Sequence, residues 1–226
     1  MWGNVKLQQR VTRRSLFMVF WSKAANGPFD KTPSKGVTFA GYNSLMKSLC
    51  VFCGSSPGNR PAYAALAVQA GELVTRRGLT LVYGGGRVGL MGALADAALA
   101  AGGRVVGVIP QMLIDREVGH AGLSQLHVVR TMSERKLLMG DLADAFLALP
   151  GGIGTMDELF EAWTWTQLGL HRKPCALLNQ DGYYDPLLAF LDRSVNEGFL
   201  QPRYRAALLV ADDVETALDR LTAAVS

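Results

Sequence analysis

The most specific chemical feature of the chain is the glycine-rich segment 150–158 (PGGIGTMDE), which follows an apolar run and precedes a helical pattern. Glycines let the backbone approach a ligand closely, and the free N–H groups at the start of a helix attract an anion such as phosphate. No lysine follows the glycines, so a P-loop that hydrolyses nucleoside triphosphates is not expected. Thr155 is predicted to cap the helix or bind phosphate. Glu158 is predicted either to interact with the helix dipole or to act as a catalytic carboxylate.

Two adjacent cations, Arg135 and Lys136, lie near the start of another expected helix. Thr131 and Glu134 have the spacing of a capping box, with Thr at the N-cap and Glu three residues later. The cations then lie just beyond the first turn, where positive charge opposes the helix dipole. Either an anion nearby compensates them, or they form a solvated basic pair.

Two further glycine-rich loops follow expected strands. Gly84, Gly86 and Gly89 match the dinucleotide fingerprint G-x-G-x-x-G, but the next strand ends at 108–111 (VIPQ) without the acid that would bind a ribose. NAD binding is therefore not expected, and this loop is interpreted as a general phosphate site at a helix N-terminus. The loop 54–58 (GSSPG) either offers two hydroxyls to an oxyanion or is a plain turn.

Three cysteines bear on metal and redox chemistry. Cys50 and Cys53 form a C-x-x-C without a second pair, and Cys175 stands alone, so no metal site is expected. The cysteines are interpreted as buried core thiols rather than redox or metal groups. An odd number of cysteines without a secretory leader fits a reducing cytoplasm.

The chemical loops are positioned by apolar runs that alternate with helical patterns over residues 46–226. The runs occupy 48–53, 80–83, 104–109, 126–129, 145–149, 175–178 and 207–210, and the helical patterns occupy about 61–77, 89–101, 132–143, 155–168, 185–197 and 213–224. Continuous apolar strands separated by helices are typical of a parallel sheet buried on both faces. The sequence therefore predicts a single α/β domain with a doubly wound, Rossmann-like, mostly parallel sheet flanked by helices. Its ligands are expected beyond the carboxyl ends of the strands.

Residues 1–45 differ from the rest in charge and pattern. They carry seven Lys or Arg and one acid, a net charge of +6. Residues 46–226 carry a net charge of −2, and the two parts together give the net charge of +4 of the whole chain. The domain therefore lacks the basic balance of a nucleic-acid-binding protein, and no apolar run reaches the roughly 18 residues that suggest a membrane span. The leader is interpreted as a misassigned start before Met46, a disordered tail or a targeting peptide.

Together these motifs resemble the LOG (lonely guy) family of cytokinin riboside 5′-monophosphate phosphoribohydrolases. The family signature P-G-G-x-G-T-x-x-E matches 150–158 throughout, the R-K pair matches Arg135 and Lys136, and Y-G-G-G matches 83–86. The opening C-x-x-x-S-S is matched less tightly, by C-G-S-S at 53–56. The resemblance spans about 46–226 and includes 158–165 (ELFEAWTW).

The resemblance implies a hydrolase without a cofactor that cleaves the N-glycosidic bond of a cytokinin riboside 5′-monophosphate or AMP, releasing the base and ribose 5-phosphate. The implied catalytic residues are Arg135 and Glu158. The implied substrate-binding residues are Glu117, Arg135, Lys136, Gly151, Gly152, Ile153, Gly154, Thr155, Met156, Asp157, Glu158 and Thr164. Ser55, Gly85 and Gly86 are further substrate-binding candidates from the other two glycine loops.

Two other functions compete with hydrolysis. Members of the family have been labelled lysine decarboxylases, but a pyridoxal phosphate enzyme needs a Schiff-base lysine. The only lysines of residues 46–226 are Lys47, Lys136 and Lys173, and none has a recognisable setting for that role. The other alternative is a non-catalytic nucleotide or molybdopterin-cofactor carrier of the same fold, which would need the glycine loops and the cations but not Glu158.

The expected helix 155–168 carries apolar residues on more than one face, namely Leu159, Phe160, Ala162, Trp163, Trp165 and Leu168. One sheet face covers only a stripe of roughly 100°, so part of this surface needs another partner, either a neighbouring helix or a second copy. We expect a symmetric homodimer, as the resemblance also implies. Arg116 and Glu117 in the loop 110–125 are candidates to contribute to the partner's cleft.

Overall fold

Seven parallel strands form one sheet in the computed structural model, which describes residues 46–116 and 119–225. They are β1 (Ser48–Phe52), β2 (Thr80–Tyr83), β3 (Val105–Pro110), β4 (Gln125–Val129), β5 (Ala145–Ala148), β6 (Cys175–Leu178) and β7 (Leu208–Ala211). All seven predicted strands are confirmed to within one residue at each end. The predicted leader 1–45 lies outside the described residues.

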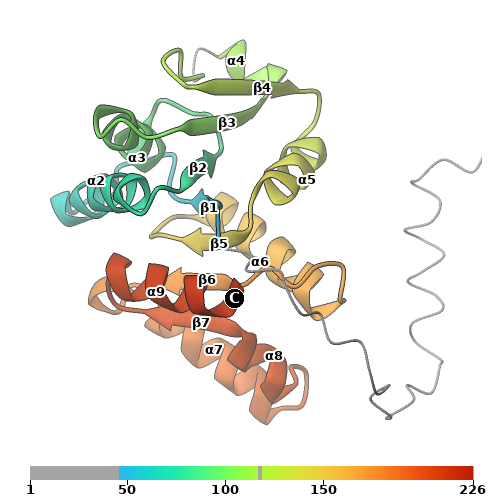
Figure 1. Ribbon diagram of the computed structural model, residues 1–226. Helices are drawn as coiled ribbons and strands as arrows, with labels where there is room; N and C mark the ends of the chain where they lie inside the picture. The colour runs from blue at the N-terminus through green and yellow to red at the C-terminus, as the bar shows by residue number, and fades with distance from the viewer. Residues whose placement is uncertain (1–45, 117–118, 226) are drawn as a thin grey trace, which may run out of the picture. The chain divides into compact units, whose positions relative to one another are not determined.

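The strand order is β4-β3-β2-β1-β5-β6-β7 (Figure 1). The chain moves outward from β1 to β4, returns to place β5 on the other side of β1, and then continues to β7. The carboxyl ends of β1 and β5 therefore form the switch point, where ligands bind in doubly wound sheets. The glycine-rich segment 150–158 begins at this point.

Helices cover both faces of the sheet (Figure 1). One face carries α2 (Pro61–Arg76), α3 (Gly89–Ala100) and α9 (Val214–Val225), and the other carries α5 (Met132–Leu142), α6 (Ile153–Gln167) and α7 (Asp185–Asn196). Three short elements were not predicted: α4 (Gln111–Ile114), α8 (Pro202–Ala207) and a 3₁₀ turn at Gln180–Gly182. Each is too short to show a helical period in the sequence.

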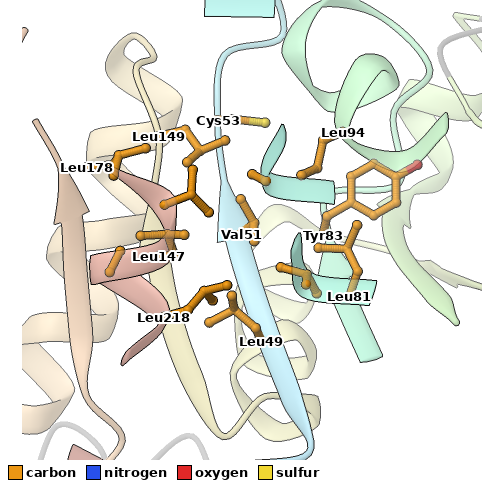
Figure 2. Packing of buried hydrophobic residues seen from close by; sticks show 14 of the residues in the cluster. Leu49, Val51, Cys53, Leu81, Tyr83, Leu94, Leu147, Leu149, Leu178 and Leu218 are labelled. Carbon is orange, nitrogen blue, oxygen red and sulfur yellow. The ribbon is translucent and has the colours of Figure 1, made fainter. Parts of the chain in front are cut away.

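Successive residues of β1 face opposite core layers. Leu49, Val51 and Cys53 pack under α2, α3 and α9 (Figure 2), whereas Cys50 and Phe52 pack under α5 and α6. All three cysteines are buried free thiols, as predicted. Burial raises the pKa of each thiol, so these cysteines stay protonated and unreactive at neutral pH.

Most of the apolar surface of α6 is buried within its own chain. Leu159, Ala162 and Trp163 are buried among residues of the second core layer, and Nε1 of Trp163 donates to the carbonyl of Tyr204 at 3.1 Å. Burial within the same chain, one of the two alternatives for this surface, therefore accounts for these three residues. Leu168 differs, because half of its surface is exposed.

Candidate active site

The segment 150–154 leads from β5 into α6 at the carboxyl edge of the sheet. Among the described residues, none accepts a hydrogen bond from the N–H groups of residues 151–155, whereas the N–H of Met156 donates to Gly152 O at 3.1 Å. A run of backbone donors and the positive end of a helix dipole are thus available at one place. This arrangement suits a phosphate group.

Gly152, not Thr155, is the N-cap of α6, because the helix begins two residues earlier than predicted. Thr155 is buried instead and lies under the glycine loop, where a Cβ on Gly151 would be 2.1 Å from its hydroxyl oxygen. The N-cap alternative for Thr155 is therefore wrong. The close approach explains why residue 151 has no side chain.

A pocket of about 240 Å³ lies beside this loop. Its walls include Ser55 and Gly58 after β1, Tyr63 from α2, Gly151 after β5, and Tyr183 after β6. The switch point thus contains a cavity formed by loops from three strands. Ser55, a predicted substrate-binding residue, is exposed in its wall.

Arg135 is buried between strands and helices, with 6% of its surface exposed. Its Nε donates to Val108 O at 3.1 Å and its Nη2 to Gly84 O at 3.1 Å. Its Nη1 lies 3.1 Å from Oε1 of Glu158. A Cβ on Gly84 would lie only 1.8 Å from Nη2. The glycine after β2 therefore provides the space in which the guanidinium is held.

Glu158 is nearly as buried, with 9% exposed. Burial raises the pKa of Glu158 above that of an exposed glutamate, and the charge of Arg135 offsets part of this increase. The two predicted catalytic residues therefore form one buried ion pair in which each partner controls the orientation of the other.

Lys136 is held between two carboxylates of α6. Its Nζ lies 2.9 Å from Oδ2 of Asp157 and 2.8 Å from Oε2 of Glu161. Burial lowers the pKa of Lys136, but hydrogen bonds to Glu161 and Asp157 outweigh this effect and raise it overall. The prediction that nearby anions compensate the cations is confirmed, and the alternative of a solvated pair is wrong.

The glycine loop after β2 packs against neighbouring backbone. Gly85 has φ +74° and faces β3, where its Cβ would lie 3.0 Å from that of Ile109. Gly86 forms a β-bridge with Gly119. Both glycines are buried, and their part in substrate binding stays a prediction.

The remaining predicted substrate residues have different surroundings. Ile153 is 91% exposed, open space surrounds Gly154, and Met156 packs against the second core layer. Thr164 is exposed. Helix geometry places it about 9 Å along α6 from Glu158 and on a different face. Glu117 lies outside the described residues.

Tyr183 and Tyr184 are site residues that the sequence analysis missed. The hydroxyl of Tyr183 donates to Gly151 O at 2.8 Å, and that of Tyr184 donates to Leu149 O at 2.7 Å. Their place after β6, at the carboxyl edge of the sheet, was the only available signal. The sequence does not reveal which loop they reach.

No group of His, Cys, Asp and Glu within residues 46–116 and 119–225 is arranged to hold a metal ion. In the same part of the chain, none of the helices has the length and apolar character needed to cross a membrane.

Residues 91–221 match a protein family described as possible lysine decarboxylase. The chain is 53% identical over 173 residues to a cytokinin riboside 5′-monophosphate phosphoribohydrolase of Rhodococcoides fascians, with 76% of this chain and 87% of that protein covered. It is 47% identical over 178 residues to a protein of the same name from Arabidopsis thaliana, with 79% and 82% covered.

Among solved structures, a molybdenum cofactor binding protein of Rippkaea orientalis has a TM-score of 0.63 at 22% identity, covering 81% of this chain and 100% of that one. The molybdenum cofactor carrier protein of Chlamydomonas reinhardtii has a TM-score of 0.59 at 19% identity, covering 79% and 98%. These similarities concern the fold, and they confirm the predicted α/β architecture.

Proposed function

The chain belongs to the LOG family, whose curated members are named cytokinin riboside 5′-monophosphate phosphoribohydrolases, and from this premise we propose that it hydrolyses the N-glycosidic bond of a cytokinin riboside 5′-monophosphate or of AMP. The products are the free base and ribose 5-phosphate. The observation that carries the proposal is the buried ion pair between Arg135 of α5 and Glu158 of α6, the helix whose N-terminal N–H groups are available to a phosphate.

The ion pair suits the reacting bond. Cleavage of the bond between C1′ and the base builds positive charge on the ribose in an oxocarbenium-like transition state. An ionised Glu158 beside C1′ stabilises this charge and accepts a proton from the water whose oxygen bonds to C1′. The base leaves with the electron pair of the broken C1′–N bond and takes up a proton from solvent. Arg135 orients Glu158 and favours its ionised form.

The glycine loop suits the other end of the substrate. The 5′-phosphate is bound by the N–H groups of residues 151–155. These contacts stay the same throughout the reaction. They therefore act by holding the ribose in place beside Glu158.

The two competing functions fit the site less well. Lys136 is paired with two carboxylates, Nζ of Lys173 donates to Gly140 O at 2.6 Å, and Lys47 is exposed before β1, so none of these lysines is placed for a Schiff base. A nucleotide or molybdopterin-cofactor carrier needs no buried carboxylate beside its ligand. The cost of burying Glu158 is better explained by catalysis.

The test is direct. Purified protein is incubated with AMP, with isopentenyladenosine 5′-monophosphate and with adenosine, and the products are separated by chromatography. Release of free base from the monophosphates is the expected result, and the ratio of the two rates identifies the preferred base. Tight binding of either nucleotide without cleavage would instead identify a carrier.

We further propose that the protein is a homodimer that uses α5 and the end of α6. Leu137, Leu168 and Leu170 are 51%, 50% and 58% exposed. The two helices contact each other where the ring of Trp165 lies against Gly140. Thr164 is exposed on a different face of α6 from its own Glu158, which favours a contact of Thr164 with the substrate of a second subunit.

A further inference from the structure

The carbonyl groups of the glycine loop are all engaged, and by donors from different elements. Leu149 O accepts from the hydroxyl of Tyr184 at 2.7 Å and Gly151 O from the hydroxyl of Tyr183 at 2.8 Å. Between them, Pro150 O accepts from the N–H of Gly54 at 3.2 Å. The loop therefore offers its N–H groups to a ligand while its carbonyl oxygens are bound elsewhere.

We propose that Tyr183 is a positioning residue that fixes the orientation of the Gly151–Gly152 peptide for recognition of the substrate phosphate. The inference rests on the proposed function. In a planar trans peptide, the carbonyl of Gly151 and the N–H of Gly152 point in opposite directions. A hydroxyl that holds the carbonyl on one side of the loop therefore holds the N–H toward the other.

This peptide needs an external restraint because both of its residues are glycines. Without side chains they adopt a wide range of φ and ψ, so rotation of the peptide is sterically easy. A rotated peptide would present the carbonyl oxygen of Gly151 to the phosphate and would replace an attraction by a repulsion. The Tyr183 hydroxyl disfavours this state.

The ring of Tyr183 is itself held in place. It meets the ring of Tyr63 edge-on, with centroids 5.5 Å apart, and the ring of Tyr184 edge-on at 4.7 Å. Removing only the hydroxyl would leave these ring contacts intact. Tyr183→Phe is therefore a test of the hydrogen bond, with little effect expected on folding.

The experiment compares the wild-type protein with Tyr183→Phe and with the control Tyr204→Phe. The Tyr204 hydroxyl contacts only Arg203, its exposed neighbour, in a described hydrogen bond. Binding of ribose 5-phosphate is measured by calorimetry, and kcat and KM are measured with AMP and with adenosine, which lacks the phosphate. For Tyr183→Phe, we expect the Kd for ribose 5-phosphate and the KM for AMP to rise about five- to tenfold, with kcat nearly unchanged. The preference for AMP over adenosine should fall by the same factor, and Tyr204→Phe should match the wild type.

Three results would overturn the inference. One is unchanged binding of ribose 5-phosphate by Tyr183→Phe. The second is an equal loss on AMP and adenosine, which would indicate a general disturbance of the site. The third is a wild-type protein that neither binds ribose 5-phosphate nor cleaves AMP. That last result would remove the proposed function as well, whereas the first two leave it standing.

Discussion

At the scale of single residues, the site depends on two charges that are buried together. Removing one partner of a buried ion pair leaves the other unpaired, which costs about 3–5 kcal/mol. Arg135 also binds two backbone carbonyls, so it remains partly satisfied without Glu158. Glu158 has no comparable second partner among the described hydrogen bonds and ion pairs. Glu158 therefore depends more strongly on Arg135 than Arg135 depends on Glu158.

Glu158→Gln tests the catalytic role. Glutamine keeps an oxygen that accepts a hydrogen bond from Arg135, but it carries no negative charge to stabilise the ribose or take a proton. We expect kcat to fall at least about 100-fold with a modest change in KM. Steady-state kinetics on a variant whose circular dichroism matches the wild type gives the answer. Near-normal turnover would contradict the assignment.

The pH dependence of kcat tests the electrostatics of the pair. Burial raises the pKa of Glu158. In the proposed mechanism the ionised form is the active one, so kcat should fall on acidification at a higher pH than for an ordinary glutamate. Arg135→Gln removes the charge that offsets this increase. The acid limb should therefore move to still higher pH.

Profiles of kcat between about pH 4 and 8 at saturating AMP measure the acid limb of the wild type and that of Arg135→Gln. Glu158→Gln serves as the control, because any limb that persists in its residual activity belongs to another group. An Arg135→Gln profile with the wild-type midpoint would show that Arg135 does not control Glu158.

At this scale, the sequence predicted candidate residues but not how they meet. The residue types and the motif spacing pointed to Arg135 and Glu158, whereas the contact between these two side chains depends on α5 and α6 packing side by side. The role of Gly84 as the space for Arg135 depends on the same packing. The hydroxyls of Tyr183 and Tyr184 act over distances in the chain that no local pattern encodes.

At the scale of elements, strands were the easiest to predict, because both faces of a parallel sheet are apolar. The N-cap of α5 was also predictable: the Thr131 hydroxyl accepts from the N–H of Glu134 at 3.1 Å. The start of α6 was not, since glycines normally weaken a helix. Here the first turn instead leaves its N–H groups available, and the helix starts with Ile153 after Gly152.

The packing of α2 against α3 predicts that a glycine-to-alanine substitution in α2 lowers the free energy of unfolding, although helix propensity alone would raise it. A Cβ on Gly71 of α2 would lie 2.3 Å from Leu94 O of α3. Gly71→Ala should therefore destabilise the protein by about 1–3 kcal/mol. Helix propensity alone would stabilise it by up to about 1 kcal/mol.

Urea denaturation measures the change in the free energy of unfolding. The matched control is Ala65→Gly at an exposed position of the same helix, which should cost about 1 kcal/mol through propensity. Both variants, Gly71→Ala and Ala65→Gly, are expected to be less stable than the wild type. A more stable Gly71→Ala variant would show that α2 and α3 can move apart without cost.

At the scale of the whole molecule, the chain divides by charge into a leader with net +6 and a remainder with net −2. We expect a variant that lacks residues 1–45 to fold and to hydrolyse AMP at the wild-type rate, because every described site residue lies beyond Met46. Thermal unfolding and kinetics of the two forms provide the comparison. A melting temperature lower by several degrees would indicate that the leader stabilises the domain.

The last prediction concerns the assembly of two subunits. Leu137, Leu168 and Leu170 expose apolar surface on α5 and at the end of α6, and burying them in a two-fold interface would stabilise a dimer. Light scattering at micromolar concentration should give about twice the 24.4 kDa of the chain.

Leu168→Glu should weaken the dimer, because two-fold symmetry places its charge in the interface from both subunits. Phe190→Glu is the control, since Phe190 is 62% exposed on α7, outside the proposed interface. If Thr164 serves the partner's site, the Leu168→Glu monomer should lose activity along with association. A fully active monomer of 24.4 kDa would refute a shared site.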